Sequence, residues 1–268
     1  MPLEKIQNIL IDTQIISSEF LKRKVTFDVY FPPEDLLEKK PRLLLINDGQ
    51  DLVTMDFKTI LENLYEEKQI SPLICVGIHC GADRRNEYGT AGILDYKGLG
   101  AKAPEYTRFI FEELMPFIRK HYQIISFREK SFCGFSLGGL SALDIVWNHP
   151  KEFSKVGVFS GSLWWRMLSQ DDPEFSEEQH RIMHVKIRNG NYSPWLKFFF
   201  ETGTLDETAD RNNNGIIDSI DDTLSLIDEL VKKGYDPERD IRYLELPDGK
   251  HDVATWARAF PEFLKWMS

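Results

Sequence analysis

From residue 42 onward, short apolar runs alternate with longer segments of helical period. The runs are expected strands, most of them apolar enough to be covered on both faces, at 42–47, 72–78, 130–133, 155–160, 196–201 and 241–246. The expected helices between them cover 56–67, 104–122, 137–147, 221–233 and 252–266. Repeated strand–helix units place parallel strands in one sheet with helices on both faces. The sequence therefore predicts an α/β fold.

The first forty residues have a different pattern. Two extended stretches, 14–18 and 24–31, end at Pro32-Pro33 and predict an antiparallel hairpin at the start of the sheet. The 268 residues contain no repeat and no linker, so residues 1–268 are expected to form a single domain. The long, polar, irregular segment 164–194 is the expected lid or substrate mouth.

Charge and hydropathy exclude several classes of function. The formal net charge is −10, so the basic surplus that drives nucleic-acid binding is missing. No apolar run is long enough to span a bilayer, and residues 1–8 lack the layout of a signal peptide. The three cysteines lie in apolar, strand-like runs and are expected to be reduced. These features favour a cytoplasmic protein without a membrane partner, and they leave its oligomeric state open.

A candidate nucleophile lies between an expected strand and an expected helix. Residues 134–139 read Gly-Phe-Ser-Leu-Gly-Gly, with the serine at position 136. In a nucleophile elbow the serine occupies a tight, strained turn, and the flanking glycines avoid collisions with neighbouring backbone. The alternative is an accidental match, which the strand before and the helix after argue against. Ser136 is therefore the expected nucleophile.

A serine hydroxyl needs a base, and the base needs an acid to orient it. His251 lies in a glycine-containing loop between the last expected strand and the last expected helix, where a sheet of this kind delivers side chains to its carboxyl edge. Asp206 follows the strand before it and is the expected acid. Glu207 and Asp210 remain rivals for that role.

The backbone N–H of Leu137 begins a helix and is expected to donate to the oxyanion. The second donor normally comes from the loop after an earlier strand, where the N–H of Gln50 is favoured over the alternative of an ordinary turn. Trp164, Trp165 and Trp256 are candidate residues of a substrate pocket, although aromatic residues at such spacing are more often part of the core.

Several motifs together resemble one family. They are Leu-Ile-Asn-Asp-Gly-Gln at 45–50, Arg-Asn-Glu-Tyr at 85–88, the glycine-rich run at 134–139, Ser-Gly-Ser-Leu-Trp-Trp at 160–165, Gly-Thr-Leu-Asp-Glu at 203–207 and Gly-Lys-His at 249–251 with Trp256. The chain is similar to the esterase D-like branch of the α/β-hydrolases, which includes formylglutathione hydrolases, enterochelin esterases, feruloyl esterases and mycolyltransferases.

The resemblance implies an α/β-hydrolase fold with Ser136, His251 and Asp206 as a catalytic triad, and with the Gln50 and Leu137 amides as the oxyanion hole. Where formylglutathione hydrolases have a His-Gly-type motif, this chain has Asn-Asp-Gly at 47–49, which is nearer to the enterochelin esterases. A fold does not carry a substrate with it, so the natural ester stays open.

A second motif fits the twelve-position calcium loop. Residues 210–221 place oxygen donors at alternate positions and glycine at position 6, and the expected ligands are Asp210, Asn212, Asn214, Ile216 through its carbonyl, Asp218 and Asp221. A structural calcium ion here would fix the loop that presents the catalytic acid. The alternative is an asparagine-rich turn that caps the following helix.

The sequence thus predicts a serine hydrolase that cleaves carboxylic esters of small molecules through an acyl-enzyme intermediate, without an organic cofactor. Two alternatives stay open. One is an acyltransferase with the same triad, in which an alcohol replaces water. The other is a catalytically silent binding protein stabilised by calcium.

Overall fold

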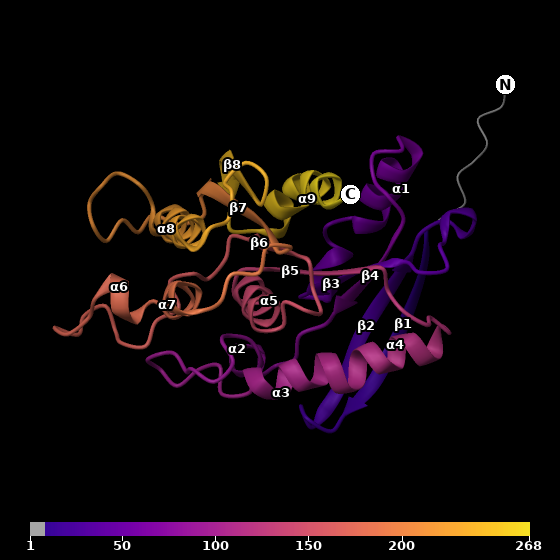
Figure 1. Cartoon of the computed structure of the whole chain (residues 1–268), viewed down its shortest axis with the longest axis horizontal. Coiled ribbons are helices and arrows are strands. Elements are labelled where there is room, and N and C mark those ends of the chain that lie inside the picture. Colours follow the sequence, from indigo (N-terminus) through magenta and orange to yellow (C-terminus); the bar gives the residue numbers. More distant parts are fainter. Residues whose placement is uncertain (1–8) are drawn as a thin grey trace.

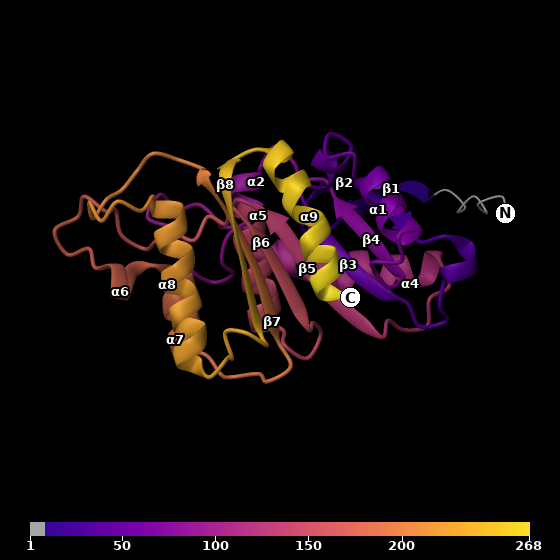
Figure 2. The ribbon, with the colours of Figure 1, turned by 90° about the horizontal axis from the view of Figure 1, so that it is seen from above.

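The computed structural model describes residues 9–268 and contains one eight-stranded sheet of order β1-β2-β4-β3-β5-β6-β7-β8 (Figures 1 and 2). The strands are β1 (Leu10–Ser18), β2 (Arg23–Phe31), β3 (Arg42–Asn47), β4 (Leu73–Ile78), β5 (Glu129–Phe135), β6 (Lys155–Phe159), β7 (Lys197–Leu205) and β8 (Ile241–Lys250). The β1–β2 and β2–β4 pairs are antiparallel, and every other pair is parallel. The expected parallel sheet with an antiparallel N-terminal hairpin is confirmed.

Helices cover both faces of the sheet. They are α1 (Phe57–Glu66), α2 (Arg84–Glu87), α3 (Ala103–Arg108), η3 (Phe109–Leu114), α4 (Met115–His121), α5 (Leu137–Asn148), α6 (Glu177–His180), α7 (Ile182–Asn189), α8 (Asp218–Lys233) and α9 (Val253–Met267), with short 3-10 turns η1 (Glu34–Leu36) and η2 (Gly49–Leu52). Helices α1 and α9 cover one face, and α3 to α5, α7 and α8 cover the other (Figure 1).

The core under α9 is rich in aromatic residues. Phe159 of β6 contacts both Phe260 and Phe263 of α9, with ring centroids 5.1 and 5.5 Å apart. Phe135, at the end of β5, stacks on Trp256 at 5.0 Å. Burying one aromatic side chain contributes roughly 1.5–3 kcal/mol, so this layer fixes α9, and with it the loop that carries His251, on the sheet.

Several boundaries differ from those expected. The expected helix 104–122 is a continuous run of α3, η3 and α4, with a π-helical middle. Strands β7 and β8 extend beyond residues 201 and 246, because they pair with each other over their whole length. Helix α8 begins at Asp218 instead of residue 221. Strand pairing and helix capping set these ends, and periodicity does not reveal them.

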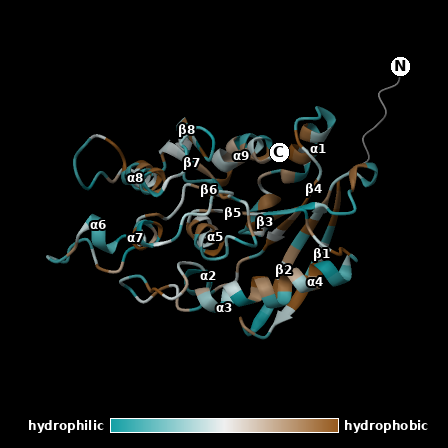
Figure 3. Cartoon of the chain, in the orientation of Figure 1, coloured by the Kyte–Doolittle hydropathy of each residue, from teal (hydrophilic) through white to brown (hydrophobic). Residues whose placement is uncertain are grey.

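Segment 164–194 is more ordered than its composition suggested. It contains α6 and α7, and α7 buries Ile182, Met183 and Ile187 against the core. The stretch around α6 is largely hydrophilic (Figure 3). The role of this segment as a lid stays a prediction.

The sequence analysis expected neither a signal peptide nor a membrane span. The first expectation rested on residues 1–8, which lie outside the described part of the chain. Within residues 9–268, no helix combines the length and the apolar character that a membrane span requires.

Candidate active site

Ser136 lies in the turn between β5 and α5. Its backbone has φ 54° and ψ −123°, a conformation that residues other than glycine rarely adopt. A Cβ added at Gly134 would lie 2.4 Å from the carbonyl oxygen of Gly138, so the chain can turn this sharply only with glycine there. The structure thus has the strand–turn–helix geometry expected of a nucleophile elbow.

The two expected oxyanion donors lie in the first turns of helices. Leu137 is the first residue of α5, and Gln50 is the second residue of η2, which follows β3. The first N–H groups of a helix have no partner within the helix and are free to bind an anion. The Gln50 side chain accepts a hydrogen bond from the Cys80 amide at 3.1 Å, which holds the loop against the end of β4.

Two further contacts join the loop after β3 to the elbow. Asn47 is fully buried, donates to the carbonyl of Gly138 at 2.8 Å and accepts from the Tyr106 hydroxyl at 2.6 Å. Asp48 has a left-handed backbone with φ 59° and accepts two hydrogen bonds from Arg84, both at 2.7 Å. Buried polar groups that are fully paired in this way hold a loop in one position.

Arg84 also donates to the carbonyl of Phe135 at 3.3 Å, beside Ser136. Its guanidinium is partly exposed and contributes positive charge to the site, as its effect on His251 shows below. The sequence analysis did not single out Arg84. The motif that carries the family resemblance starts only at residue 85, and the contact between Arg84 and Asp48 joins loops that lie 36 residues apart.

The expected acid and base lie at the carboxyl ends of neighbouring strands. Asp206 immediately follows β7, and His251 immediately follows β8. The two strands approach unusually closely where they pass, since a Cβ added at Gly203 would lie 2.3 Å from the carbonyl carbon of Gly249. The strand register also shifts between Gly203 and Leu205. Glycine at this crossing lets the two segments approach each other.

Charge effects distinguish Asp206 from its rivals. Partial burial lowers the pKa of His251 below its ordinary value. The charge of Asp206 opposes that shift, the charge of Arg84 adds to it, and Asp252, the next residue in the chain, opposes it less strongly than Asp206 does. Neither Glu207 nor Asp210 acts on His251 in this way. Burial likewise raises the pKa of the Asp206 carboxyl, and the charge of His251 opposes it. Asp206 and His251 are therefore electrostatically coupled.

The three side chains are not joined by hydrogen bonds. Within residues 9–268, the recorded neighbour of Ser136 Oγ is Ser162 Oγ at 3.3 Å, and both Asp206 carboxylate oxygens are buried without a partner. His251 lies at the surface, and its imidazole is packed on one side against Trp256. In enzymes without substrate, catalytic hydrogen bonds are often long or misaligned.

Ser160 joins the end of β6 to α9. It follows β6 with a strained φ of 44°, and its hydroxyl accepts a hydrogen bond from the Trp256 indole at 3.0 Å. Trp256 in turn packs edge-on against His251, with ring centroids 5.4 Å apart. Glu201, which the sequence analysis did not name, is buried on β7 in the same region.

The expected aromatic pocket is only partly present. Trp165 is 1% exposed and packs beside Gly89 and Gly100, so it belongs to the core and does not line an open mouth. Trp164 is 37% exposed and remains available to a ligand. Trp256 is 7% exposed and forms the wall behind His251.

The expected calcium loop has two different halves. In the first half, Asp210 accepts hydrogen bonds from the amides of Asn214 and Gly215, which is compatible with a cation-binding turn. In the second half, Arg211 pairs with Asp218 at 3.2 Å and lies 3.9 Å from Asp221. Asn212 also directs its amide N–H toward Asp221. In this arrangement Asp218 and Asp221 are engaged by protein partners, and among residues 9–268 no group of three or more acidic, histidine or cysteine side chains could hold a metal. Calcium binding by this loop stays a prediction.

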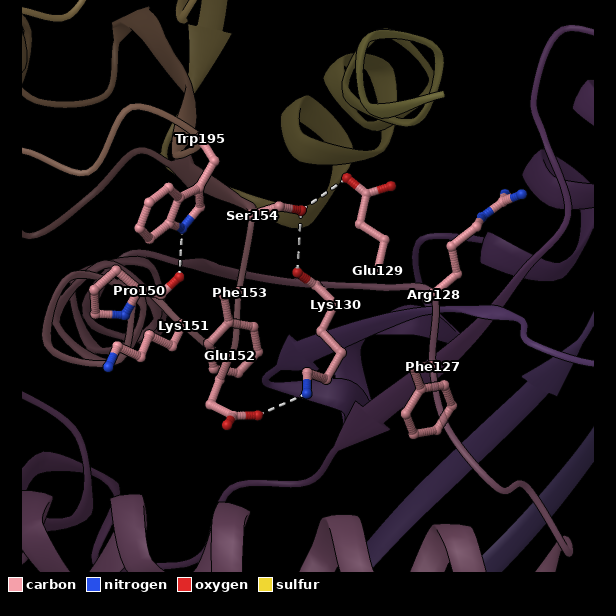
Figure 4. A pocket seen from close by; sticks show the side chains of 10 residues that line it. All are labelled: Phe127, Arg128, Glu129, Lys130, Pro150, Lys151, Glu152, Phe153, Ser154 and Trp195. Carbon is pink, nitrogen blue, oxygen red and sulfur yellow. Dashed lines mark hydrogen bonds and ion pairs between the residues drawn. The ribbon is translucent and has the colours of Figure 1, made fainter.

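One hollow lies away from these residues. It has a volume of about 470 Å³ and lies at the opposite edge of the sheet, where β5 and β6 begin (Figure 4). Several of its charged residues already have partners, as in the Lys130–Glu152 ion pair, and the Trp195 indole donates to the Pro150 carbonyl. Nothing in this hollow points to a ligand.

Comparison with known proteins adds a family. The sequence model of a family described as "Putative esterase" matches residues 18–267. The YjcH protein of Bacillus subtilis, described as uncharacterized, is 24% identical over 254 residues, which are 93% of this chain and 94% of that protein.

Solved structures share the fold. The enterobactin esterase of Shigella flexneri, in the presence of enterobactin, has a TM-score of 0.73 and 21% identity, covering 97% of this chain and 58% of that one. The chain thus spans about three-fifths of that esterase. The BES protein of Bacillus cereus has a TM-score of 0.70 and 18% identity over 100% of this chain and 99% of that one. An IroE-like serine hydrolase from Shewanella oneidensis has a TM-score of 0.69 and 19% identity over 96% and 80%. The chain therefore belongs to the family described as "Putative esterase", and it shares the α/β-hydrolase fold of these solved structures.

Proposed function

We propose that this protein hydrolyses esters of small molecules with Ser136, His251 and Asp206 as its catalytic triad. The observation that carries the proposal is the strained backbone of Ser136 at the junction of β5 and α5. A conformation of this kind costs of order 1–3 kcal/mol, and such strain clusters at functional sites. It directs the serine side chain away from the strand and toward the carboxyl edge of the sheet.

In the proposed reaction, the Ser136 hydroxyl attacks the ester carbonyl while His251 takes its proton. His251 then gives that proton to the leaving alcohol, and the acyl group stays on Ser136. Water, deprotonated by His251, releases the acid in a second round. The lowered pKa of His251 supports this role, because the imidazole is neutral and able to accept a proton at neutral pH.

The amides of Leu137 and Gln50 are the proposed donors to the oxyanion that forms in each round. Removing one such donor typically costs about 10²–10³-fold in rate. The Asp48–Arg84 pair and the Asn47 contacts support the proposal, because they fix the loop that carries Gln50 relative to the elbow. Asp206 would orient His251 and stabilise its charged form.

The proposal requires the His251 imidazole to hydrogen-bond Ser136 Oγ, which here lies 3.3 Å from Ser162 Oγ. Substrate binding commonly tightens such contacts.

A fluorophosphonate probe tests the nucleophile. We expect the native protein to be labelled and to hydrolyse p-nitrophenyl esters, and Ser136→Ala to lose both. Ser162→Ala is the matched control, since it removes the hydroxyl that lies 3.3 Å away. Labelling that persists in Ser136→Ala but disappears in Ser162→Ala would reassign the nucleophile. Adding acceptor alcohols and analysing the products separates hydrolysis from acyl transfer.

Calcium binding by residues 210–221 is a separate proposal. It would require Asp218 and Asp221 to release Arg211, and the preformed Asp210 turn is what supports it. Thermal unfolding with calcium and with a chelator tests it, and Asp210→Ala is the control. An unchanged melting temperature in the native protein would refute it.

A further inference from the structure

Glu201 is a buried carboxyl group without a visible partner. It lies on β7 between Phe200 and Thr202, with 1% of its surface exposed. Neither carboxyl oxygen has a hydrogen-bond partner among the described residues. Burying an ionised carboxylate without a partner is very costly, so such a group either finds a counter-charge or keeps its proton.

Among residues 9–268, Glu201 has no unpaired counter-charge. The charged groups that act on it are Asp206 at the end of its own strand and Arg258 on α9, whereas Tyr243 pairs with Phe200 and lies on the other face of the sheet. Arg258 is already paired with Asp248 at 2.8 Å, and its side chain is 51% exposed. The Tyr243 hydroxyl is committed to Thr202 and Glu245. The remaining neighbour, Asp206, is itself an acid and opposes ionisation of Glu201.

Ser160 lies beside Glu201, because its amide donates to the Glu201 carbonyl at 2.8 Å. Its hydroxyl oxygen accepts from the Trp256 indole, which leaves its single proton free to donate. That proton would favour the ionised form of whichever carboxyl group it reached, Glu201 or Asp206, but it can serve only one of them. The second carboxyl group therefore needs a further proton. Glu201 is the group that retains it, because Asp206 is less buried and faces His251.

We propose that Glu201 is a positioning residue for the catalytic acid: as a neutral carboxylic acid it donates a hydrogen bond within the Glu201–Ser160–Asp206 group, so that Asp206 alone carries the negative charge that faces His251. This inference rests on the proposed catalytic role of Asp206. Glu201 does not touch the substrate, and it acts by holding the Asp206 carboxylate in place.

The acid–base properties of Glu201 agree with this assignment. Burial and the charge of Asp206 raise the pKa of Glu201 from 4.5 to about 8. A carboxyl group whose pKa is higher in the folded state contributes stability that is complete below its unfolded value, and this contribution is lost as the pH rises through its folded value. The window for Glu201 is therefore from about pH 4.5 to about pH 8.

Infrared spectroscopy of the full chain tests protonation without reference to activity. We expect the carbonyl band of a protonated carboxyl group at pH 7, lost in Glu201→Gln and titrating near pH 8 in the native protein. In Asp206→Asn the midpoint should move to lower pH, because the opposing charge is gone. Absence of the band at pH 7, or an unchanged midpoint in Asp206→Asn, would overturn the proposal.

Kinetics test the positioning role. Glu201→Gln keeps a donor without a charge and should retain kcat within about 3-fold at pH 7, whereas Glu201→Leu should lose about 10-fold in kcat with little change in KM. Above pH 8 the native rate should fall toward that of Glu201→Leu, and Glu201→Gln should show no such fall. An identical alkaline fall in Glu201→Gln, or a native kcat in Glu201→Leu at pH 7, would refute positioning. Failure of the triad itself would appear separately, as full activity in Ser136→Ala or Asp206→Asn.

Discussion

The close approach of β7 and β8 makes Gly203→Ala a sharp test of the site geometry. The new methyl group would lie 2.3 Å from the Gly249 carbonyl carbon, and ordinary contact begins at 3.4 Å. The strands must therefore separate by about 1 Å between the segments that carry Asp206 and His251. A misplacement of about 1 Å in a catalytic group can cost on the order of 100-fold in rate. Overpacking costs roughly 1–3 kcal/mol, or about 2–10 °C in melting temperature.

The matched control is Gly190→Ala, after α7. Its methyl group would lie 2.7 Å from the Trp147 indole nitrogen, away from the site, and its backbone is ordinary with φ −80°. We expect both variants to lose similar thermal stability, but only Gly203→Ala to lose about 100-fold in kcat/KM for a p-nitrophenyl ester. If Gly203→Ala stays within about 3-fold of native activity, or if Gly190→Ala loses as much, the crossing does not set the catalytic geometry.

Three further outcomes are expected. The acidic limb of kcat/KM against pH should have its midpoint below 6.5, because burial and Arg84 lower the pKa of His251. Arg84→Gln should move that midpoint to higher pH. A midpoint that stays fixed in Arg84→Gln would contradict this coupling. Asn47→Leu should destabilise the fold by roughly 3 kcal/mol, measured as a lower urea midpoint at constant m, because it leaves two buried groups unpaired. Trp256→Phe removes the indole donor to Ser160, so it should lower kcat at a temperature where the variant is still fully folded. A native kcat in the folded variant would refute that role.

Local signals in the sequence were sufficient for much of the fold. The β5–turn–α5 unit around Ser136 was predicted because the glycine spacing, the preceding strand and the following helix lie within about twenty residues. The order of the strands and of the longer helices followed from periodicity and turn residues, whereas α6 and α7 were not predicted. Strand ends and the π-helical middle of 109–114 did not, because pairing and packing decide them.

The supporting residues of the site could not be predicted. Arg84 and Asp48 meet across 36 residues, and Ser160 and Trp256 across 96. Glu201 lies in an apolar strand, where the sequence shows an acid but not that the acid is buried beside Asp206. Trp165 was predicted to line a pocket because it lies at the start of the segment expected to form the substrate mouth, yet it is 1% exposed while its neighbour Trp164 is 37% exposed. Such contacts depend on tertiary packing, which one sequence does not encode locally.

Helix α9 covers one face of the sheet and begins immediately after the loop that carries His251. Any event that detaches this helix from the sheet would therefore also displace His251 and inactivate the protein. The same event would uncover the aromatic rings beneath it, including Phe159 and Phe199, and create a surface that associates with other copies. In this chain, the loss of catalysis and the onset of aggregation would share one cause.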